Sequence, residues 1–245
     1  MDAAELRSVS NNCSATYLDP CDSVYVPYVY VLTPLCSIGV IFNCLNIAVF
    51  LSKPFYGLFV SRATVAVAGA RSARAQHVGT TLIQLLALSV ADVACLLMAV
   101  PMGTVRCIPP TGGTTQLVAR QVYEVVGMPL LNTFAAASVW LTTVIAVKRF
   151  VHVRRSGNVV KTTSNSSERR RTWLGVSAIY VGALLAHLPY LFSKQIDPSR
   201  TKPATTEFGA SLAFEIYLWI RMVIVKLIPI IITFATNIAL VSVTH

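Results

Sequence analysis

The amino-acid sequence predicts an all-α membrane protein, a bundle of five transmembrane helices. Two of the observations are compositional: 55% of the 245 residues are hydrophobic and only 12% are charged, whereas about a quarter of the residues in a soluble domain carry a charge. The third is that five segments are apolar over the roughly 20 residues that a helix needs to cross a bilayer. The lipid bilayer is therefore an expected partner of the chain.

The predicted spans follow one another along the chain, and residues 28–243 form the helix bundle. The spans cover residues 28–51, 78–101, 122–147, 172–192 and 214–243. Residues 1–27 form a polar, acidic tail without the apolar core of a secretory signal peptide, so the first span is expected to insert as its own signal. Residues 244–245 form the short opposite end.

Lysine and arginine counts in the connections predict the orientation of the helices. Residues 52–77 hold four such cations and residues 148–171 hold eight, more than the other two connections, so these two are expected on the cytoplasmic side. The amino terminus is then extracellular, as in a multi-pass protein of the plasma membrane. The net charge of +10 therefore indicates topology and gives no evidence for a nucleic-acid partner.

The outer, oxidising side carries the candidates for covalent modification. Cys13, Cys21 and Cys107 are disulfide candidates, and because three cysteines cannot all pair internally, their pairing stays open. Asn12 begins an Asn-Cys-Ser sequon in the extracellular tail, so we expect it to be glycosylated.

Asp92 lies inside the second span, where a carboxylate costs about 2.5 to 3.5 kcal/mol on insertion scales. Asn43 in the first span and Ser138 in the third offer uncharged oxygen atoms at a similar depth. Together they predict either a site for a monovalent cation or proton, or a set of hydrogen bonds that only holds the helices together.

The fifth span contains two cations, Arg221 and Lys226. They are five residues apart, about 140° around a helix of 3.6 residues per turn, so a regular helix would not point both into the same groove. Lys226 is expected to extend toward the membrane surface. Pro129, Pro189 and Pro229 interrupt the last three spans and free backbone carbonyls that neighbouring helices have to satisfy.

Four motifs in order along residues 28–243 carry a family resemblance: "FNCLNIAVF", "LALSVAD", "SVWLTTVIAVKRF" and "LIPIIITFATNIAL". With them the chain resembles the first five helices of rhodopsin-like G-protein-coupled receptors. It looks most similar to invertebrate neuropeptide receptors of the sex-peptide/myoinhibitory-peptide and FMRFamide receptor group, which "HLPYLF" also fits.

The resemblance implies a receptor for an extracellular peptide that activates a heterotrimeric G protein, with receptor oligomers as a further form of association. It implies an activation switch at Lys148, Arg149, Phe150, Pro229 and Asn237, and a pocket for a sodium ion at Asn43, Asp92 and Ser138. No other cofactor is expected. The candidate ligand contacts lie at the outer ends of the helices: Glu124, Asn132, His187, Glu215, Tyr217 and Arg221.

The sequence also departs from the family pattern. Lys148 stands where the family has an acid beside the switch arginine, which predicts a weaker resting lock on Arg149. Phe42 replaces the small residue before Asn43, and the disulfide cysteine at the outer start of the third helix is missing. The family's helices six and seven are not in this sequence, so we expect an incomplete form.

Three other functions compete with the receptor. A short form that does not signal would modulate a full-length partner, for example by retaining it in the endoplasmic reticulum. An ion transporter or channel component would use Asp92 with Arg221 or Lys226, but the repeated halves typical of transporters are absent from the sequence. An enzyme is not expected, because the sequence has no His-Glu-x-x-His, no zinc-spaced cysteine pair and no Gly-x-Ser-x-Gly.

Overall fold

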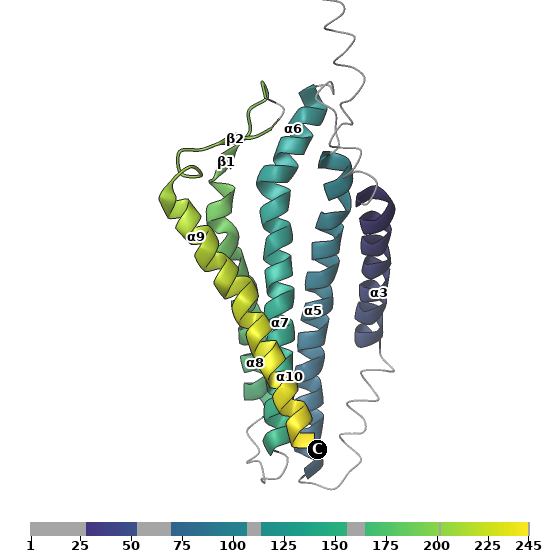
Figure 1. Ribbon diagram of the computed structural model, residues 1–245. Coiled ribbons are helices and arrows are strands. Elements are labelled where there is room, and N and C mark those ends of the chain that lie inside the picture. The colour runs from purple at the N-terminus through teal and green to yellow at the C-terminus, as the bar shows by residue number, and fades with distance from the viewer. Residues whose placement is uncertain (1–27, 53–69, 107–113, 156–164, 201, 245) are drawn as a thin grey trace, which may run out of the picture.

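The computed structural model describes residues 28–52, 70–106, 114–155, 165–200 and 202–244, which form a bundle of long helices (Figure 1). The predicted glycosylation site Asn12 and the disulfide candidates Cys13, Cys21 and Cys107 lie outside the described residues.

The helices of the first half are η1 (Tyr28–Leu32) with α3 (Thr33–Leu51), and α5 (Ala70–Arg106). The central helix consists of α6 (Thr114–Val122), η2 (Tyr123–Gly127) and α7 (Met128–Arg155). The second half consists of α8 (Asn165–Leu191), the hairpin strands β1 (Lys194–Gln195) and β2 (Ala204–Thr205), and a last helix built from α9 (Leu212–Met222), η3 (Val223–Leu227) and α10 (Ile228–Thr244).

Five helices are long and apolar enough to cross a membrane, which confirms the predicted fold class. Their candidate spans are Tyr30–Leu51, Gly79–Met102, Thr114–Arg154, Ser167–Leu191 and Leu212–Ser242. The third and fourth helices begin earlier than the sequence predicted, at Thr114 and Asn165. Their first turns are polar, and a criterion based on apolar residues does not detect helical turns of that kind.

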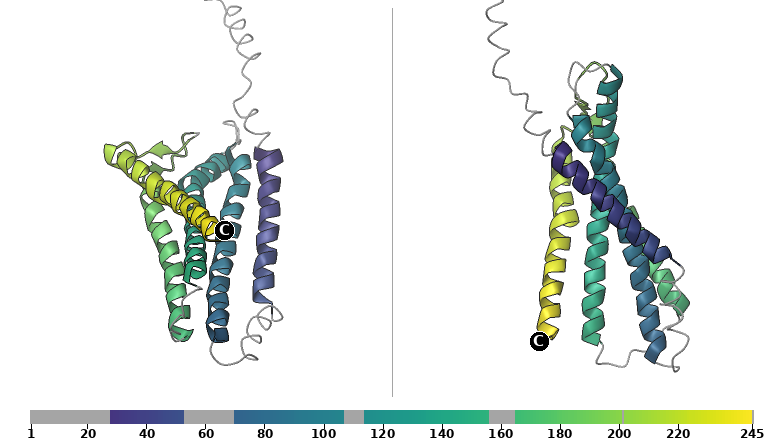
Figure 2. Two further views of the ribbon diagram at one scale, coloured as in Figure 1. Left: turned by 60° about the horizontal axis from the view of Figure 1, so that its bottom comes forward. Right: turned by 90° about the vertical axis from the view of Figure 1, so that its right-hand side faces the viewer.

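The central helix α7 organises the bundle. It contacts α5, α8 and α10, while α3 packs against α5 on the far edge, and α9 and α10 cross the face of α7 diagonally (Figures 1 and 2). The buried apolar cluster consists mainly of small residues: Ala87, Ala91, Ala136, Ala137, Leu141, Val176, Ala183 and Val225. Small side chains allow helices to approach closely, as is typical of membrane helix interfaces.

Two tyrosine hydroxyl groups join other helices to backbone carbonyls of α5. The Tyr180 hydroxyl of α8 donates to the Ala87 carbonyl of α5 over 2.7 Å, and the Tyr123 hydroxyl of η2 donates to the Met98 carbonyl of α5 over 2.5 Å. Neither bond was predicted from the sequence. Both fix the position of α5 relative to the helices that carry the candidate site.

Each π-helical segment ends two residues before a proline. The segments end at Leu32, Gly127 and Leu227, and the prolines are Pro34, Pro129 and Pro229. Proline has no backbone N–H group and its ring collides with the carbonyl of residue i−4 in a regular helix. A wider turn with i→i+5 hydrogen bonds removes that collision and keeps the preceding carbonyls bonded.

The β1–β2 hairpin lies at the end of the bundle where α8 finishes and α9 begins, here called the hairpin end (Figure 1). Gln121 fastens the connection between the two strands to α6. Its side-chain Nε2 donates to the carbonyls of Asp197 and Arg200 over 2.8 and 2.6 Å, and its Oε1 accepts from the Asp197 N–H over 2.7 Å. The Gln121 side chain is fully buried, at 0% exposure.

The loop between β2 and α9 requires a glycine at position 209. A Cβ atom on Gly209 would lie 2.2 Å from the backbone oxygen of Ser193, the oxygen that accepts the Thr206 N–H over 3.1 Å. The close approach is between backbone segments, so a side-chain rotation cannot relieve it.

Gly209→Ala is therefore expected to lower the free energy of unfolding by about 1 to 3 kcal/mol, the usual cost of overpacking. The measurement is thermal unfolding of the purified chain in lipid nanodiscs. Gly175→Ala is the matched control, because a Cβ atom there meets nothing within 4 Å. Equal unfolding midpoints for the two variants would contradict the described loop geometry.

Candidate functional site

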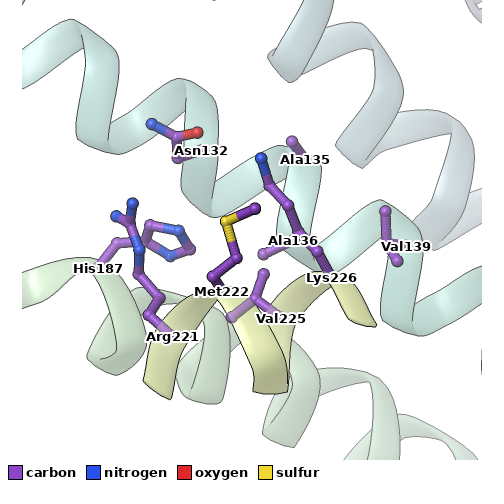
Figure 3. Close-up of a pocket in the computed structure, with 9 residues that line it drawn as sticks. All are labelled: Asn132, Ala135, Ala136, Val139, His187, Arg221, Met222, Val225 and Lys226. Carbon is purple, nitrogen blue, oxygen red and sulfur yellow. The ribbon is translucent and has the colours of Figure 1, made fainter. Parts of the chain in front are cut away.

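A cavity of about 90 Å³ lies between α7, α8 and the α9–η3 helix (Figure 3). Its lining residues come from the first half of α7, the last turns of α8 and residues 221–226, so it lies in the half of the bundle nearer the hairpin end. The residues that line it are Asn132, Ala135, Ala136, Val139, His187, Arg221, Met222, Val225 and Lys226. Three of the six ligand contacts predicted from the sequence, Asn132, His187 and Arg221, are therefore brought to one place.

The Arg221 guanidinium group is held against two aromatic rings. Its Cζ lies 5.4 Å from the ring centroid of Tyr190 and 5.9 Å from that of Tyr217, distances at which a cation is attracted to the face of an aromatic ring. The Tyr217 ring is itself fixed, because its hydroxyl donates to the Ala186 carbonyl in α8. Tyr217, also a predicted ligand contact, thus supports Arg221 beside the cavity without lining it.

Arg221 nevertheless has one nitrogen without an acceptor. Its Nη1 atom is buried and forms no hydrogen bond with any described residue. A buried donor that loses its water and gains no partner costs free energy, and the cost is larger for a charged group.

Lys226 shares the cavity with Arg221, so the prediction that the two cations could not face one groove was wrong. It assumed 3.6 residues per turn throughout, but η3 is a π-helix with i→i+5 hydrogen bonds, and residues five apart therefore lie much closer to the same face. Figure 3 shows Lys226 extending from η3 toward α7, with Met222 between it and Arg221.

His187 and Asn132 are each fixed by their own helices. His187 is 4% exposed, and its Nδ1 lies 2.8 Å from the Ala183 carbonyl; because a carbonyl only accepts, Nδ1 carries a proton. The Asn132 Nδ2 donates to the Met128 carbonyl over 2.9 Å. Both side chains are thus held in place at the wall of the cavity.

The two acidic ligand candidates lie elsewhere. Glu124 forms ion pairs with Arg120 in α6, over 3.4 Å, and with Lys194 in β1, over 3.9 Å, so its charge stabilises the hairpin end. Glu215 is exposed on α9. Neither residue is among those that line the cavity, which leaves its described lining with two cations and no carboxylate.

The hairpin end has a further local charge arrangement at Asp197. The Ser199 side-chain hydroxyl donates to this carboxylate over 2.5 Å and the Ser199 backbone N–H over 3.0 Å. These two hydrogen bonds hold the pKa of Asp197 below its usual value. The carboxylate thus stays ionised beside Arg200, whose Nε lies 3.0 Å from it.

Asp92 and Ser138 meet as the sequence predicted. The Ser138 hydroxyl in α7 donates to the Asp92 carboxylate in α5 over 2.6 Å. Asn43 does not complete the set, since its Nδ2 donates to the Gly39 carbonyl of its own helix over 3.0 Å. A carboxylate and a hydroxyl fit the predicted sodium ion in part only, and the ion stays a prediction.

The five switch residues implied by the resemblance are spread along α7 and α10. Lys148 and Arg149 are exposed and Phe150 is half-buried near the end of α7, and the described residues include no ion-pair partner for Arg149. Pro229 is fully buried, whereas Asn237 is exposed on α10.

A groove of about 400 Å³ runs between α7 and α10, next to the switch residues. Its polar lining residues are Ser138, Thr142, Thr233 and Asn237, and its apolar ones are Val139, Pro229, Ile230 and Phe234. The hydroxyls of Thr143 and Thr233 lie 3.0 Å apart and join the two helices there.

Sequence interpretation missed two groups that shape the site. One is Tyr190, whose ring forms a cation–π contact with the guanidinium of Arg221. Its place directly after Pro189 in "HLPYLF" was a signal that could have marked it as a site residue. The other is Gln121. Nothing in the sequence indicates that its side chain is buried, because a glutamine in an amphipathic helix is usually exposed.

Neither a protein-family model nor a curated protein matches the chain. The cavity and the Asp92–Ser138 pair are the features of the described residues that bear on function.

Proposed function

We propose that the chain supplies the first five helices of a rhodopsin-like receptor that binds an extracellular neuropeptide and acts on a heterotrimeric G protein. In this proposal the hairpin end faces outward in the plasma membrane and the ends of α7 and α10 face the cytoplasm. The peptide enters at the hairpin end, and its innermost part occupies the cavity between α7, α8 and α9.

One observation carries the proposal: Asn132, His187 and Arg221, chosen from three separate spans as ligand contacts, line a single cavity. Cavities between the helices of a bundle are a common place for ligand sites. The Asp92–Ser138 bond adds support, because it joins α5 and α7 at the position where the resemblance implies a pocket that changes on activation.

The test is G-protein activation in cells, using the chain completed with the family's sixth and seventh helices and a panel of neuropeptides in amidated and in free-acid form. At least one peptide is expected to activate in a saturable manner, and Asn132→Leu is expected to lower its potency about tenfold or more, since a buried polar contact is worth about 1.4 kcal/mol. Ser177→Leu, on the exposed face of α8, is the control. No response to any peptide at normal surface expression would refute the proposal.

The groove between α7 and α10 favours a second candidate function. The exposed Asn237 side chain lines this groove, and an amide group at membrane depth is satisfied best by another helix. A chain of this kind could use the groove to bind a full-length receptor and modulate it. Co-expression with a complete receptor tests this, and an unchanged surface level of that receptor would exclude it.

A further inference from the structure

The cavity between α7, α8 and α9 has an unusual electrostatic composition for a site inside a membrane protein. Its described lining includes Arg221 and Lys226 and no acidic side chain. Charged residues at membrane depth are normally paired with each other or with backbone groups. An excess of positive charge without a counter-ion therefore indicates that an anion arrives from outside the chain.

Arg221 is the group most ready to receive that anion. Its Nη1 is buried and has no hydrogen-bond acceptor among the described residues, while Tyr190 and Tyr217 hold the guanidinium in one orientation. The rings attract the positive charge, and the Tyr217 hydroxyl forms a side-chain hydrogen bond with Arg221, but Nη1 itself has no partner among the described residues. Preorganised Arg with a free N–H group is well suited to bind a planar carboxylate.

Lys226 strengthens the positive potential of the same cavity. The π-helical turn η3 brings it to the cavity together with Arg221, and Figure 3 shows its side chain directed toward α7. Lys226 is exposed at the rim of the cavity, and its positive charge and that of Arg221 repel each other. An anion between them would remove this repulsion.

The volume limits what can enter. A cavity of about 90 Å³ is several times smaller than the roughly 300 to 1,000 Å³ of pockets that hold a whole drug-sized ligand. A carboxylate group with one or two further carbon atoms fits, and a whole peptide does not. The apolar wall formed by Ala135, Ala136 and Val139 suits the carbon atoms next to the acidic group.

We propose that this cavity binds a carboxylate, and that the ligand of the receptor is therefore a peptide whose innermost end carries a free acid. The second part rests on the proposed function, while carboxylate binding by the cavity is independent of it. Nη1 of Arg221 donates to the carboxylate, and Lys226 contributes at longer range. The acid comes either from an Asp or Glu side chain or from a free terminal carboxylate.

The first experiment measures thermal unfolding of the full chain in nanodiscs of zwitterionic lipid at constant ionic strength. Propionate is expected to raise the unfolding midpoint in a saturable manner, and propionamide, which has the same shape without the charge, is not. An equal shift with propionamide would overturn the proposal. A shift with inorganic phosphate but none with propionate would overturn it as well.

Variants then show where the anion binds. Arg221→Gln is expected to raise the dissociation constant of propionate roughly 10- to 100-fold, the value of one charge-assisted hydrogen bond. Arg200→Gln removes an exposed arginine on the hairpin end and is expected to bind propionate as the parent does. Unchanged affinity in Arg221→Gln, or an equal loss in Arg200→Gln, would contradict the assignment.

A stability measurement separates binding from a merely structural role. Without propionate, Arg221→Gln is expected to unfold at the same or a higher temperature than the parent, because it removes a buried charge with an unpaired nitrogen. A structural arginine would give the opposite result. If Arg221→Gln does not fold, propionate binding is measured on Lys226→Gln instead. A loss of propionate affinity smaller than that predicted for Arg221→Gln is expected. Propionate affinity equal to that of the parent would count against the proposal.

The last experiment identifies the source of the acid and uses the receptor assay. Peptides are compared as free acid against terminal amide, and with Glu against Gln at an inner position. One of the two acids is expected to increase potency about tenfold or more in the parent and not in Arg221→Gln. If propionate binds but no peptide activates, the cavity assignment stands and the receptor function fails; if neutral peptides are the most potent, the acidic-ligand proposal fails and the receptor stands.

Discussion

Replacing Gln121 by alanine is expected to lower the free energy of unfolding by about 2 to 4 kcal/mol, a large effect for a single polar residue. The side chain makes three hydrogen bonds to the backbone of Asp197 and Arg200, and a buried backbone group that loses its partner costs about 1 to 3 kcal/mol. Because part of this connection is exposed and regains water, the sum of three such costs is not reached.

The measurement for Gln121→Ala is thermal unfolding in nanodiscs together with amide hydrogen exchange in residues 194–205. Faster exchange in this segment is expected, since Gln121 is what fixes it to α6. Gln116→Ala is the matched control: Gln116 is on the same helix and is exposed. Identical behaviour of the two variants would show that the hairpin end does not depend on Gln121.

Ser138→Ala is expected to lower the free energy of unfolding by about 1.5 to 3 kcal/mol, the range for a hydrogen bond to a charged group. The variant leaves the Asp92 carboxylate inside the bundle without the hydroxyl that lies 2.6 Å from it. Ser177→Ala, at an exposed position on α8, is expected to change the unfolding midpoint little.

A double-mutant cycle makes this prediction sharper. In an Asp92→Asn background the acceptor is neutral, so Ser138→Ala is expected to cost only about 0.5 to 1.5 kcal/mol, the range for a neutral hydrogen bond. A smaller cost in that background indicates that the pair contains an ionised carboxylate. Equal costs in both backgrounds would show that Asp92 is protonated or that the hydrogen bond contributes no charge-dependent stability.

The sequence predicted those helices well that are defined by the length of an apolar segment. All five spans are present as long helices, because roughly 20 apolar residues have few alternatives in a bilayer. It did not predict where α6 and α8 begin, since their first turns are polar. The hairpin was also missed: two paired residues in each strand give no periodic pattern.

The candidate site could be predicted only in part, for reasons of geometry. Asp92 and Ser138 were matched correctly, because an acid inside a span needs a donor and few are available. The error over Arg221 and Lys226 came from assuming regular helix. Glu124 does not line the cavity; sequence shows that a helix end is polar, but not that Arg120 and Lys194 pair with its charge.

The π turn η3 lies just before Pro229. It changes the direction in which the side chains of α9 face relative to those of α10. Each residue of a regular helix advances the direction of its side chain by about 100°. Deleting one residue of η3 would restore a regular α-helix. The whole segment before η3, Arg221 included, would then rotate by about 100° around the helix axis, while the residues after Pro229 would keep their orientation. A single codon therefore decides which face of α9 looks inward, so related chains could acquire a different set of inward side chains without any substitution among them.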